Sequence, residues 1–188
     1  MSVAKVLTKD EIKRVLLIAE ASSYGARDKI ALELSIYAGM RIGEIAKLKI
    51  ADIRGLDGKA VDVIHLSKHQ TKGNHSRRVF VSDELRKQLD RYLKTLSGLS
   101  DDTAFIRSSR TGKHFSNVSL SLRFKSIYKA AGISTSSHSG RRTFATRKNE
   151  IGIGMRTIQQ LLGHAGIAST ALYCDVSDKQ LANAANAI

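Results

Sequence analysis

The segment LLGHAGIASTALYCD, residues 161–175, brings an imidazole and a phenol into one short stretch of chain. His164 directly follows Gly163, and glycine is the residue that most often ends a helix. Tyr173 lies nine residues beyond His164, among small side chains. Its phenol is either a packing group of the core or a hydroxyl held ready to react, and this segment alone does not decide between them.

The net charge of the chain is strongly positive. Its 188 residues include 31 Lys and Arg against 17 Asp and Glu, which gives a formal charge of +14. Such an excess attracts polyanions and is typical of nucleic-acid binding, although a ribosomal or merely basic protein would show it too. Apolar residues make up 42% of the chain, which is enough to bury a core and excludes a disordered tail.

Cysteine content and hydropathy indicate where the protein works. One cysteine excludes an internal disulfide and fits a reducing compartment. The sequence has no apolar run long enough to span a bilayer, and the N-terminal segment lacks the apolar stretch of a secretory signal. We therefore expect a cytoplasmic protein of a bacterium or a phage, without membrane contact.

Hydrophobic periodicity predicts a mostly helical domain. Thr8 and Glu11 have the spacing of a capping box and open the first helix. In the second helix we expect Ile30, Leu34 and Tyr37 to face the core. The expected helices cover residues 8–21, 26–38, 41–53, 117–131, 138–150, 155–162, 167–175 and 178–187.

Two stretches change from helical to alternating periodicity. Residues 60–66 and 77–81 alternate as strands do, and a polar, basic loop separates them, which predicts an antiparallel hairpin. Residues 101–109 are a candidate for one more short strand. The expected fold class is therefore mainly α with a small antiparallel β-sheet (α+β).

Cations and imidazoles recur at helix ends and in the hairpin loop. Arg41 stands at the entrance of a helix and Lys72 in the loop, while His138 and Arg141 are three residues apart on one helical face. Carboxylate pairs at metal-ligand spacing are missing among these segments, and so are the glycine-rich phosphate loops. This pattern favours phosphoryl transfer that uses no metal and no cofactor.

These residue types suit the attack of a tyrosine on a phosphodiester. A phenol, with an ordinary pKa of about 10, needs a base or a positive setting. A histidine can accept its proton, and an arginine can hold two non-bridging oxygens while remaining charged. A lysine whose pKa is lowered by neighbouring cations can protonate the leaving sugar oxygen.

Four segments, in this order, resemble the catalytic domain of tyrosine recombinases, the phage-integrase family: AGMRIGEIAKLKIADI (38–53), TKGNHSRRVFVS (71–82), HSGRRTFAT (138–146) and LLGHAGIASTALY (161–173). The resemblance covers about residues 8–176. Its most specific part is HxxR followed by LLGH and then a tyrosine nine residues on. It implies the DNA breaking-rejoining fold of that family.

The resemblance also implies residue roles. Tyr173 would be the nucleophile, Lys72 the acid that protonates the leaving oxygen, with Lys68 as a rival, and Glu44 the residue that orients Arg41 or braces its helix. Its implied catalytic residues are Arg41, Lys72, His138, Arg141, His164 and Tyr173. We further expect a DNA-facing surface that includes Lys68, Arg77, Arg78 and Arg142.

The implied function is site-specific DNA recombination or integration through a covalent 3′-phosphotyrosine intermediate, without metal or ATP. A type IB topoisomerase-like enzyme and a non-catalytic DNA-binding regulator on the same fold are the alternatives left open. The implied partners are double-stranded DNA, further copies of the chain (a monomer when free, a tetramer in synapsis) and accessory DNA-bending proteins. The protein would then act at the bacterial nucleoid, whether it is encoded by the bacterium or by a phage.

The sequence departs from the family in two places. Ser139 and Gly140 fill the positions inside HxxR, where many relatives carry an apolar residue before the arginine. Only seven residues precede the first helix cap, so we expect a single catalytic domain, residues 1–188, without the N-terminal core-binding domain, as in the short recombinases that invert fimbrial promoters. The tail 177–188 carries a weak apolar stripe that would pack on a neighbouring protomer.

Overall fold

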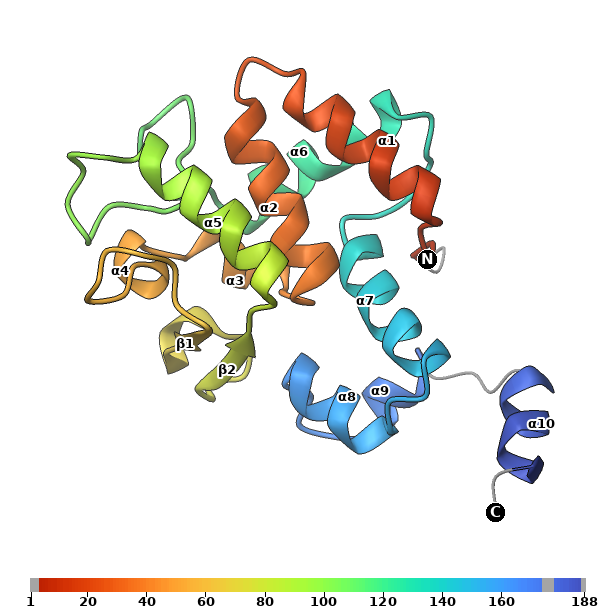
Figure 1. Ribbon diagram of the computed structural model, residues 1–188. Coiled ribbons are helices and arrows are strands. Elements are labelled where there is room, and N and C mark those ends of the chain that lie inside the picture. Colours follow the sequence, from red (N-terminus) through yellow and green to blue (C-terminus); the bar gives the residue numbers. More distant parts are fainter. Residues whose placement is uncertain (1–3, 174–177, 187–188) are drawn as a thin grey trace.

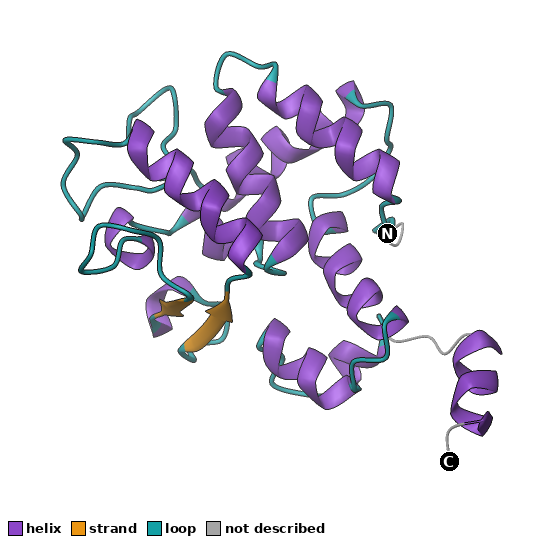
Figure 2. Ribbon diagram, in the orientation of Figure 1, coloured by secondary structure: helices purple, strands orange, loops and turns teal. Residues whose placement is uncertain are grey.

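The computed structural model describes residues 4–173 and 178–186. This part of the chain is mostly helical, with one two-stranded antiparallel sheet, so the expected fold class is confirmed (Figure 2). The helices are α1 Lys9–Glu20, α2 Gly25–Tyr37, α3 Ile42–Ala46, α4 Ile50–Ile53, α5 Asp83–Thr95, α6 Asn117–Ala130, α7 Ser139–Glu150, α8 Met155–Leu162, α9 Ala168–Ala171 and α10 Asp178–Asn186. The strands are β1 Val63–Leu66 and β2 Arg77–Phe80, and a short 3₁₀ helix, η1 Lys68–Gln70, follows β1.

Helix α2 is the centre of the fold. It packs against α1, α5 and α7, which surround it in Figure 1. The capping box expected before α1 is present: the Glu11 amide donates to the Thr8 hydroxyl over 3.2 Å, and the Thr8 amide donates to the Glu11 carboxylate over 3.0 Å. Ile30 and Leu34 are buried as expected, but Tyr37 is 41% exposed because it lies at the last position of α2.

The segment 41–53 forms two short helices instead of the one that we expected. The chain leaves helix α3 at Lys47, and Lys49 pairs in an isolated antiparallel bridge with Ala104. The Lys49 amide then donates to the Asp52 carboxylate over 2.8 Å, which starts α4. The candidate strand at 101–109 is therefore wrong as an extended strand, since its residues form only isolated bridges.

The hairpin is confirmed, and its register sets which residues face inward. Ile64 pairs with Val79 and both are buried, whereas His65 pairs with Arg78 and both are exposed. The first strand starts at Val63, later than expected, because residues 60–61 lie beside α4 in a bridge and a loop. The loop 67–76 that carries Lys72 therefore projects from the end of the sheet.

Helix α5 was not expected from the sequence. Its N-cap is Ser82, whose hydroxyl accepts a hydrogen bond from the Leu85 amide over 3.4 Å. Leu85, Leu89 and Leu93 are spaced four residues apart and all are buried, and α5 packs against α2. The sequence has the amphipathic spacing of a helix here, but we did not predict this helix from it.

Helices α7, α8 and α9 form a smaller part of the fold, beside β2 in Figure 1. Their apolar cluster contains Phe144, Ala145, Ile158 and Leu162, and Tyr173 packs against it. The expected helix 167–175 is short, since α9 covers only Ala168–Ala171 among the described residues.

The helix expected at 178–187 is present as α10, which lies at the edge of the molecule in Figure 1. Leu181 is 58% exposed, and Ala184 and Ala185 are exposed too. Ile188, the last member of the expected apolar stripe, lies outside the described residues.

Candidate active site

Two adjoining cavities form one groove beside the hairpin loop. Arg41, Thr71 and Lys72 line both of them. The first, of about 400 Å³, extends to His138 at the start of α7. The second, of about 770 Å³, extends to Gly163 and His164 after α8. Residues from at least four distant parts of the sequence therefore line one groove.

Arg41 is held at the start of α3 by Glu44. Its backbone amide donates to one carboxylate oxygen of Glu44 over 2.8 Å, and its guanidinium donates to the other over 2.9 Å. The Arg41 side chain keeps 25% of its surface exposed, whereas that of Glu44 is 1% exposed. The buried carboxylate therefore fixes the arginine while leaving part of its guanidinium open to the groove.

Arg77, which we expected on a DNA-facing surface, lines the second cavity, but its side chain is only 8% exposed. Its contact with DNA stays a prediction. Its guanidinium donates to both oxygens of Glu44, over 3.0 and 2.8 Å, and to the Leu161 carbonyl oxygen over 2.9 Å. The physical reason is the buried Glu44, which needs a second cation at close range. Arg77 thus joins the start of α3 to the end of α8.

The same arginines control the charge of Glu44. Burial by itself acts to raise the pKa of this carboxyl, but the hydrogen bonds and the charge of Arg77 outweigh it. The Arg41 amide and the charge of Arg141 act in the same direction, so the pKa of Glu44 lies below its usual range. Glu44 is therefore an anion at neutral pH and offsets part of the positive charge of the site.

Gly163 lets the Arg77 side chain pass. It is left-handed, with φ of 62°, as a helix-ending glycine often is. A Cβ atom at this position would lie 2.4 Å from the Cδ of Arg77. A residue other than glycine would therefore be strained in its backbone and would also push Arg77 away from Glu44.

Arg141, on α7, hydrogen-bonds both to the segment that follows α2 and to the end of α8. It is buried, and its guanidinium donates to the Gly39 carbonyl oxygen over 2.5 Å and to the Leu162 carbonyl oxygen over 2.7 Å. Burial, followed by the charge of Arg41, lowers its pKa to about 9, so that it stays charged at neutral pH. The Gly39 carbonyl lies just after α2, and the Leu162 carbonyl lies at the end of α8, where backbone oxygens lack helical partners.

His138 occupies the N-cap position of α7, on the first cavity. Burial lowers the pKa of its imidazole, and the charges of Arg141 and Arg41 lower it further. The charge of Lys72 acts on the same ring, which places the loop lysine near this histidine. Lys72 lines both cavities, whereas its rival Lys68 is an exposed residue of η1, so the groove favours Lys72 as the acid.

His164 lies against Tyr173. Their ring centroids are 6.0 Å apart, with 31° between the planes. The Nδ1 atom of His164 is 2.8 Å from the Thr170 hydroxyl, and Thr170 is buried. Burial lowers the pKa of His164 to about 4, and the charges of Arg141 and Arg41 contribute to that change. This imidazole is therefore neutral at pH 7. Sequence reasoning missed Thr170, whose only signal was its place between His164 and Tyr173.

Tyr173 is half-buried beside the small apolar cluster. Its backbone amide donates to the Thr170 carbonyl oxygen over 2.9 Å, and its carbonyl accepts from the Thr146 hydroxyl over 3.4 Å. The guanidinium carbon of Arg142 lies 5.8 Å from the ring centroid. The phenol lies near Arg141, since the charge of Tyr173 acts to raise the pKa of that arginine.

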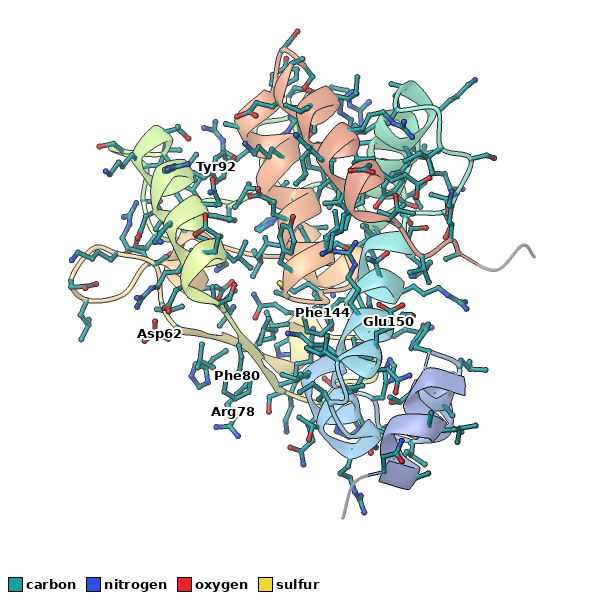
Figure 3. All side chains as sticks on the ribbon, turned by 45° about the vertical axis from the view of Figure 1, so that its right-hand side comes forward. Asp62, Arg78, Phe80, Tyr92, Phe144 and Glu150 are labelled. Atoms are coloured by element: carbon teal, nitrogen blue, oxygen red, sulfur yellow. The ribbon has the colours of Figure 1, made fainter. Side chains whose placement is uncertain are left out.

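The remaining expected DNA-facing residues lie on more than one surface. Arg78 is exposed on β2, where its guanidinium covers the Phe80 ring at 5.5 Å, and Figure 3 shows both side chains at the outer edge of the strand. Lys68 is exposed near the hairpin loop. Arg142 is half-buried near Tyr173, and its role in DNA contact stays a prediction, as do those of Arg78 and Lys68.

Within 4–173 and 178–186, no three His, Cys, Asp or Glu side chains come together as a metal site would require. Over those residues, none of the helices combines the length and the apolar character that a membrane crossing demands.

Known proteins resemble this chain over nearly all of its length. The profile described as "Phage integrase family" matches residues 5–180. Tyrosine recombinase XerA of Pyrococcus horikoshii is 33% identical over 184 residues, which are 97% of this chain and 61% of that protein. Tyrosine recombinase XerC of Vibrio cholerae is 30% identical over 182 residues, which are 95% of this chain and 56% of that protein.

Solved structures show the same fold. The crystal structure of XerA recombinase matches with a TM-score of 0.78 at 29% identity, covering 99% of this chain and 65% of that one. The Tn1549 transposon integrase in complex with transposon right end DNA matches with a TM-score of 0.75 at 18% identity, covering 98% and 66%. The chain spans less than two thirds of the length of the curated relatives named above. Because the family profile covers almost every residue, this chain belongs to the phage integrase family, as a tyrosine recombinase catalytic domain.

Proposed function

We propose that this chain cuts and rejoins duplex DNA as a site-specific recombinase, through a covalent 3′-phosphotyrosine intermediate. The observation that carries the proposal is the contact of Tyr173 with His164 at the groove that Arg41 and Lys72 line. A phenol beside fixed cations suits attack on a phosphodiester, since the cations stabilise the charge that develops on the phosphate.

The proposed step uses only groups of this chain. The Tyr173 oxygen forms a bond to phosphorus while the bond from phosphorus to the 5′-oxygen breaks. The phenolic proton passes to His138, which is neutral at pH 7 because its pKa is lowered. Lys72 gives a proton to the leaving 5′-oxygen.

Arg41, Arg141 and His164 hold the non-bridging oxygens in this proposal. Arg41 and Arg141 are each oriented by hydrogen bonds to partners inside the fold. Preorganised donors of this kind act without reorganising during the reaction. Because the phosphotyrosine bond conserves the phosphodiester bond energy, a 5′-hydroxyl of a second strand can reverse the step without ATP or a metal.

Duplex DNA and further copies of the chain are the proposed partners. Among the similar structures, XerH is bound to its difH substrate and a lambda integrase dimer is bound to a COC′ core site. We extend this to the present chain as a monomer that assembles into a tetramer on paired sites, helped by DNA-bending proteins, in the bacterial nucleoid. The exposed Leu181 face of α10 would pack on a neighbouring copy, and residues 1–188 would form one catalytic domain.

A trapping experiment tests the chemistry. The protein is incubated without Mg²⁺ on a suicide substrate whose cut strand cannot be rejoined, and covalent protein–DNA adducts are counted. Tyr173→Phe is expected to abolish the adduct and leave DNA affinity nearly unchanged, because it removes only the attacking oxygen. Arg41→Ala is expected to slow adduct formation by about 100- to 1,000-fold. An adduct that survives in Tyr173→Phe would refute the assignment of the nucleophile.

A second assay separates recombination from simple relaxation. A plasmid with two copies of a cleaved site is compared with a plasmid that carries one copy. Exchange that requires both copies supports a recombinase, whereas relaxation of either plasmid without exchange would support the topoisomerase-like alternative.

A further inference from the structure

A separate cavity lies between α2 and the start of α5, apart from the groove of the active site. Its volume is about 320 Å³. The cavity is lined by Glu33, Tyr37, Ser82, Glu84, Leu85 and Gln88. Two carboxylates, a phenol, a hydroxyl and an amide oxygen make it rich in acceptors, on a chain whose formal charge is +14.

Glu33 is the unusual member of this cavity. It is 5% exposed, and among the described residues it has neither a hydrogen-bond partner nor an ion-pair partner. The other two carboxylates that are buried in the described part of the chain differ: Asp28 pairs with Arg27 and Arg123, and Glu44 pairs with Arg77. A buried charge without a partner is costly, so this carboxyl either holds a proton or meets a cation that comes from outside.

Burial also changes the proton affinity of Glu33. It raises the pKa of the carboxyl to about 7, while the charges of Lys29 and Arg91 oppose the change and those of Glu20 and Glu84 add to it. An approaching cation would reverse that effect, because an opposite charge favours the ionised carboxylate. The carboxylate is therefore able to exchange its proton for a cation near neutral pH.

The two cations that act on Glu33, Lys29 and Arg91, already have partners. The Lys29 amine donates to Glu20 over 2.8 Å, and the Arg91 guanidinium lies 3.4 Å from the Gln88 side-chain oxygen. A metal ion is poorly matched, since the cavity supplies two carboxylates and the described residues contain no group of three metal-binding side chains. An ammonium or guanidinium group needs only acceptors, which the cavity has.

We propose that this cavity receives the ammonium or guanidinium group of a lysine or arginine side chain from a second copy of the chain. The source follows from charge complementarity: each copy carries 31 such side chains, and the cavity concentrates acceptors around a buried acid. The choice of a second copy rests on the proposed function, in which DNA brings copies together. The chemistry of the cavity itself does not depend on that function.

The first arm of the test uses the protein without DNA. The full chain, labelled with ¹³C at glutamate carboxyl carbons, is titrated with n-butylammonium and n-butylguanidinium. The Glu33 signal is expected to shift toward the ionised form, and its pKa to fall. Glu33→Gln is expected to weaken binding of either probe about tenfold or more, since a charge-assisted hydrogen bond is lost.

Controls separate this site from general charge effects. Glu150→Gln removes the same charge from an exposed position on α7, and it is expected to leave probe binding unchanged. Magnesium at the same concentration is expected to leave the Glu33 signal in place. Equal binding to Glu33→Gln and the parent chain, or a response to magnesium alone, would overturn the proposal.

The second arm identifies the source of the cation. Labelled and unlabelled copies are bound to a duplex that holds one copy and to a longer duplex that holds several. The Glu33 signal is expected to shift only on the longer duplex, in the direction that the probes produce. Probe binding without that shift would overturn the assignment to a second copy. Because the first arm needs neither DNA nor cleavage, failure of the proposed recombinase activity is distinguishable from failure of the cavity proposal.

Discussion

The body formed by α1–α6 and the hairpin is held together differently from the part formed by α7–α9. The body has one large apolar cluster that runs through α1, α2, α5 and α6 and includes the buried residues of the hairpin. The α7–α9 part has a cluster of four buried residues, of which Ile158 and Leu162 come from α8. Apolar burial therefore stabilises the first region far more than the second.

The end of α8 is held to the rest of the fold by hydrogen bonds from arginine side chains. The carbonyl oxygens of Leu161 and Leu162, at the end of α8, accept hydrogen bonds from Arg77 and Arg141. Helix ends leave such carbonyls without partners, and a cation there is favourable. Arg77, on β2, thus anchors the residues that precede His164 directly to the body, and Arg141 of α7 links them to it through its second bond, to the Gly39 carbonyl oxygen. Helix α7 packs closely on α2, whereas the end of α8, which precedes the nucleophile, is joined to the body by a few directional bonds.

Arg77→Met is expected to have the largest effect on this arrangement. It leaves Glu44 buried beside one arginine in place of two, and it frees the end of α8 from the body. Loss of one partner of a buried ion pair typically costs about 3–5 kcal/mol of folding free energy. Urea unfolding measures this loss, and the suicide-substrate assay measures the accompanying fall in cleavage. Arg78→Met, one residue along β2 and exposed, is the matched control and is expected to change stability little. Similar losses in both variants would contradict the bridging role of Arg77.

Truncation of one core residue in each region is expected to separate the two regions. Leu34 in α2 and Ile158 in α8 are both fully buried, so Leu34→Ala and Ile158→Ala each create a cavity that costs about 2–5 kcal/mol where the surroundings cannot relax. We expect Leu34→Ala to lower the global unfolding midpoint more, and Ile158→Ala to accelerate amide exchange mainly in α8 and α9. At a temperature where both remain folded, cleavage is expected to fall more in Ile158→Ala. A uniform rise in exchange in both variants would show that the regions unfold as one.

Many features of the two regions were predicted from the sequence, but the link that Arg77 makes between Glu44 and the end of α8 was not. The capping box at Thr8 and the helix ends at Gly39 and Gly163 were predicted because each depends on residues close in the chain. Arg77 was assigned to the surface because strand alternation says nothing about a partner 33 residues away, and Glu44 is that partner.

Other differences have equally specific causes. Helix α5 had the spacing of an amphipathic helix and was missed, while Tyr37 fitted the apolar face of α2 but lies at its exposed end. The unusual Gly140 is explained by tertiary contact, since a Cβ there would lie 2.6 Å from the Ser35 hydroxyl where α7 crosses α2. The order of the motifs indicated the site, and only the folded chain shows what supports it.

Alanine substitutions at Gly163 and Gly152 are expected to have smaller effects, and they test the contact between Gly163 and Arg77. Gly163 and Gly152 both have positive φ, of 62° and 84°, so alanine at either position costs about 1–2 kcal/mol in backbone strain. A Cβ at Gly152 meets no atom within 4 Å, whereas one at Gly163 meets the Cδ of Arg77 at 2.4 Å. We expect similar losses of backbone stability, with a further loss of stability and a marked fall in cleavage only in Gly163→Ala. Unfolding curves and adduct formation measured on both variants check this, and equal cleavage would show that Arg77 moves aside at no cost.

The smallest expected effect is a dependence of the α7–α9 part on pH. The pKa of His164 is lowered to about 4 in the folded state, mainly by burial and then by the charges of Arg141 and Arg41. The unfolded chain, with a histidine pKa near 6.5, then binds more protons than the folded chain between pH 6.5 and about 4. Stability therefore falls as the pH drops through this window and is unaffected by this group above it. Amide exchange in α8 and α9 is expected to rise before that of α2 when the pH is lowered from 7 to 4.5. His164→Gln removes the titrating group, so its α8 amides are expected to lose most of this extra acid sensitivity. An unchanged acid response in that variant would shift the cause to the ion pairs of Glu44.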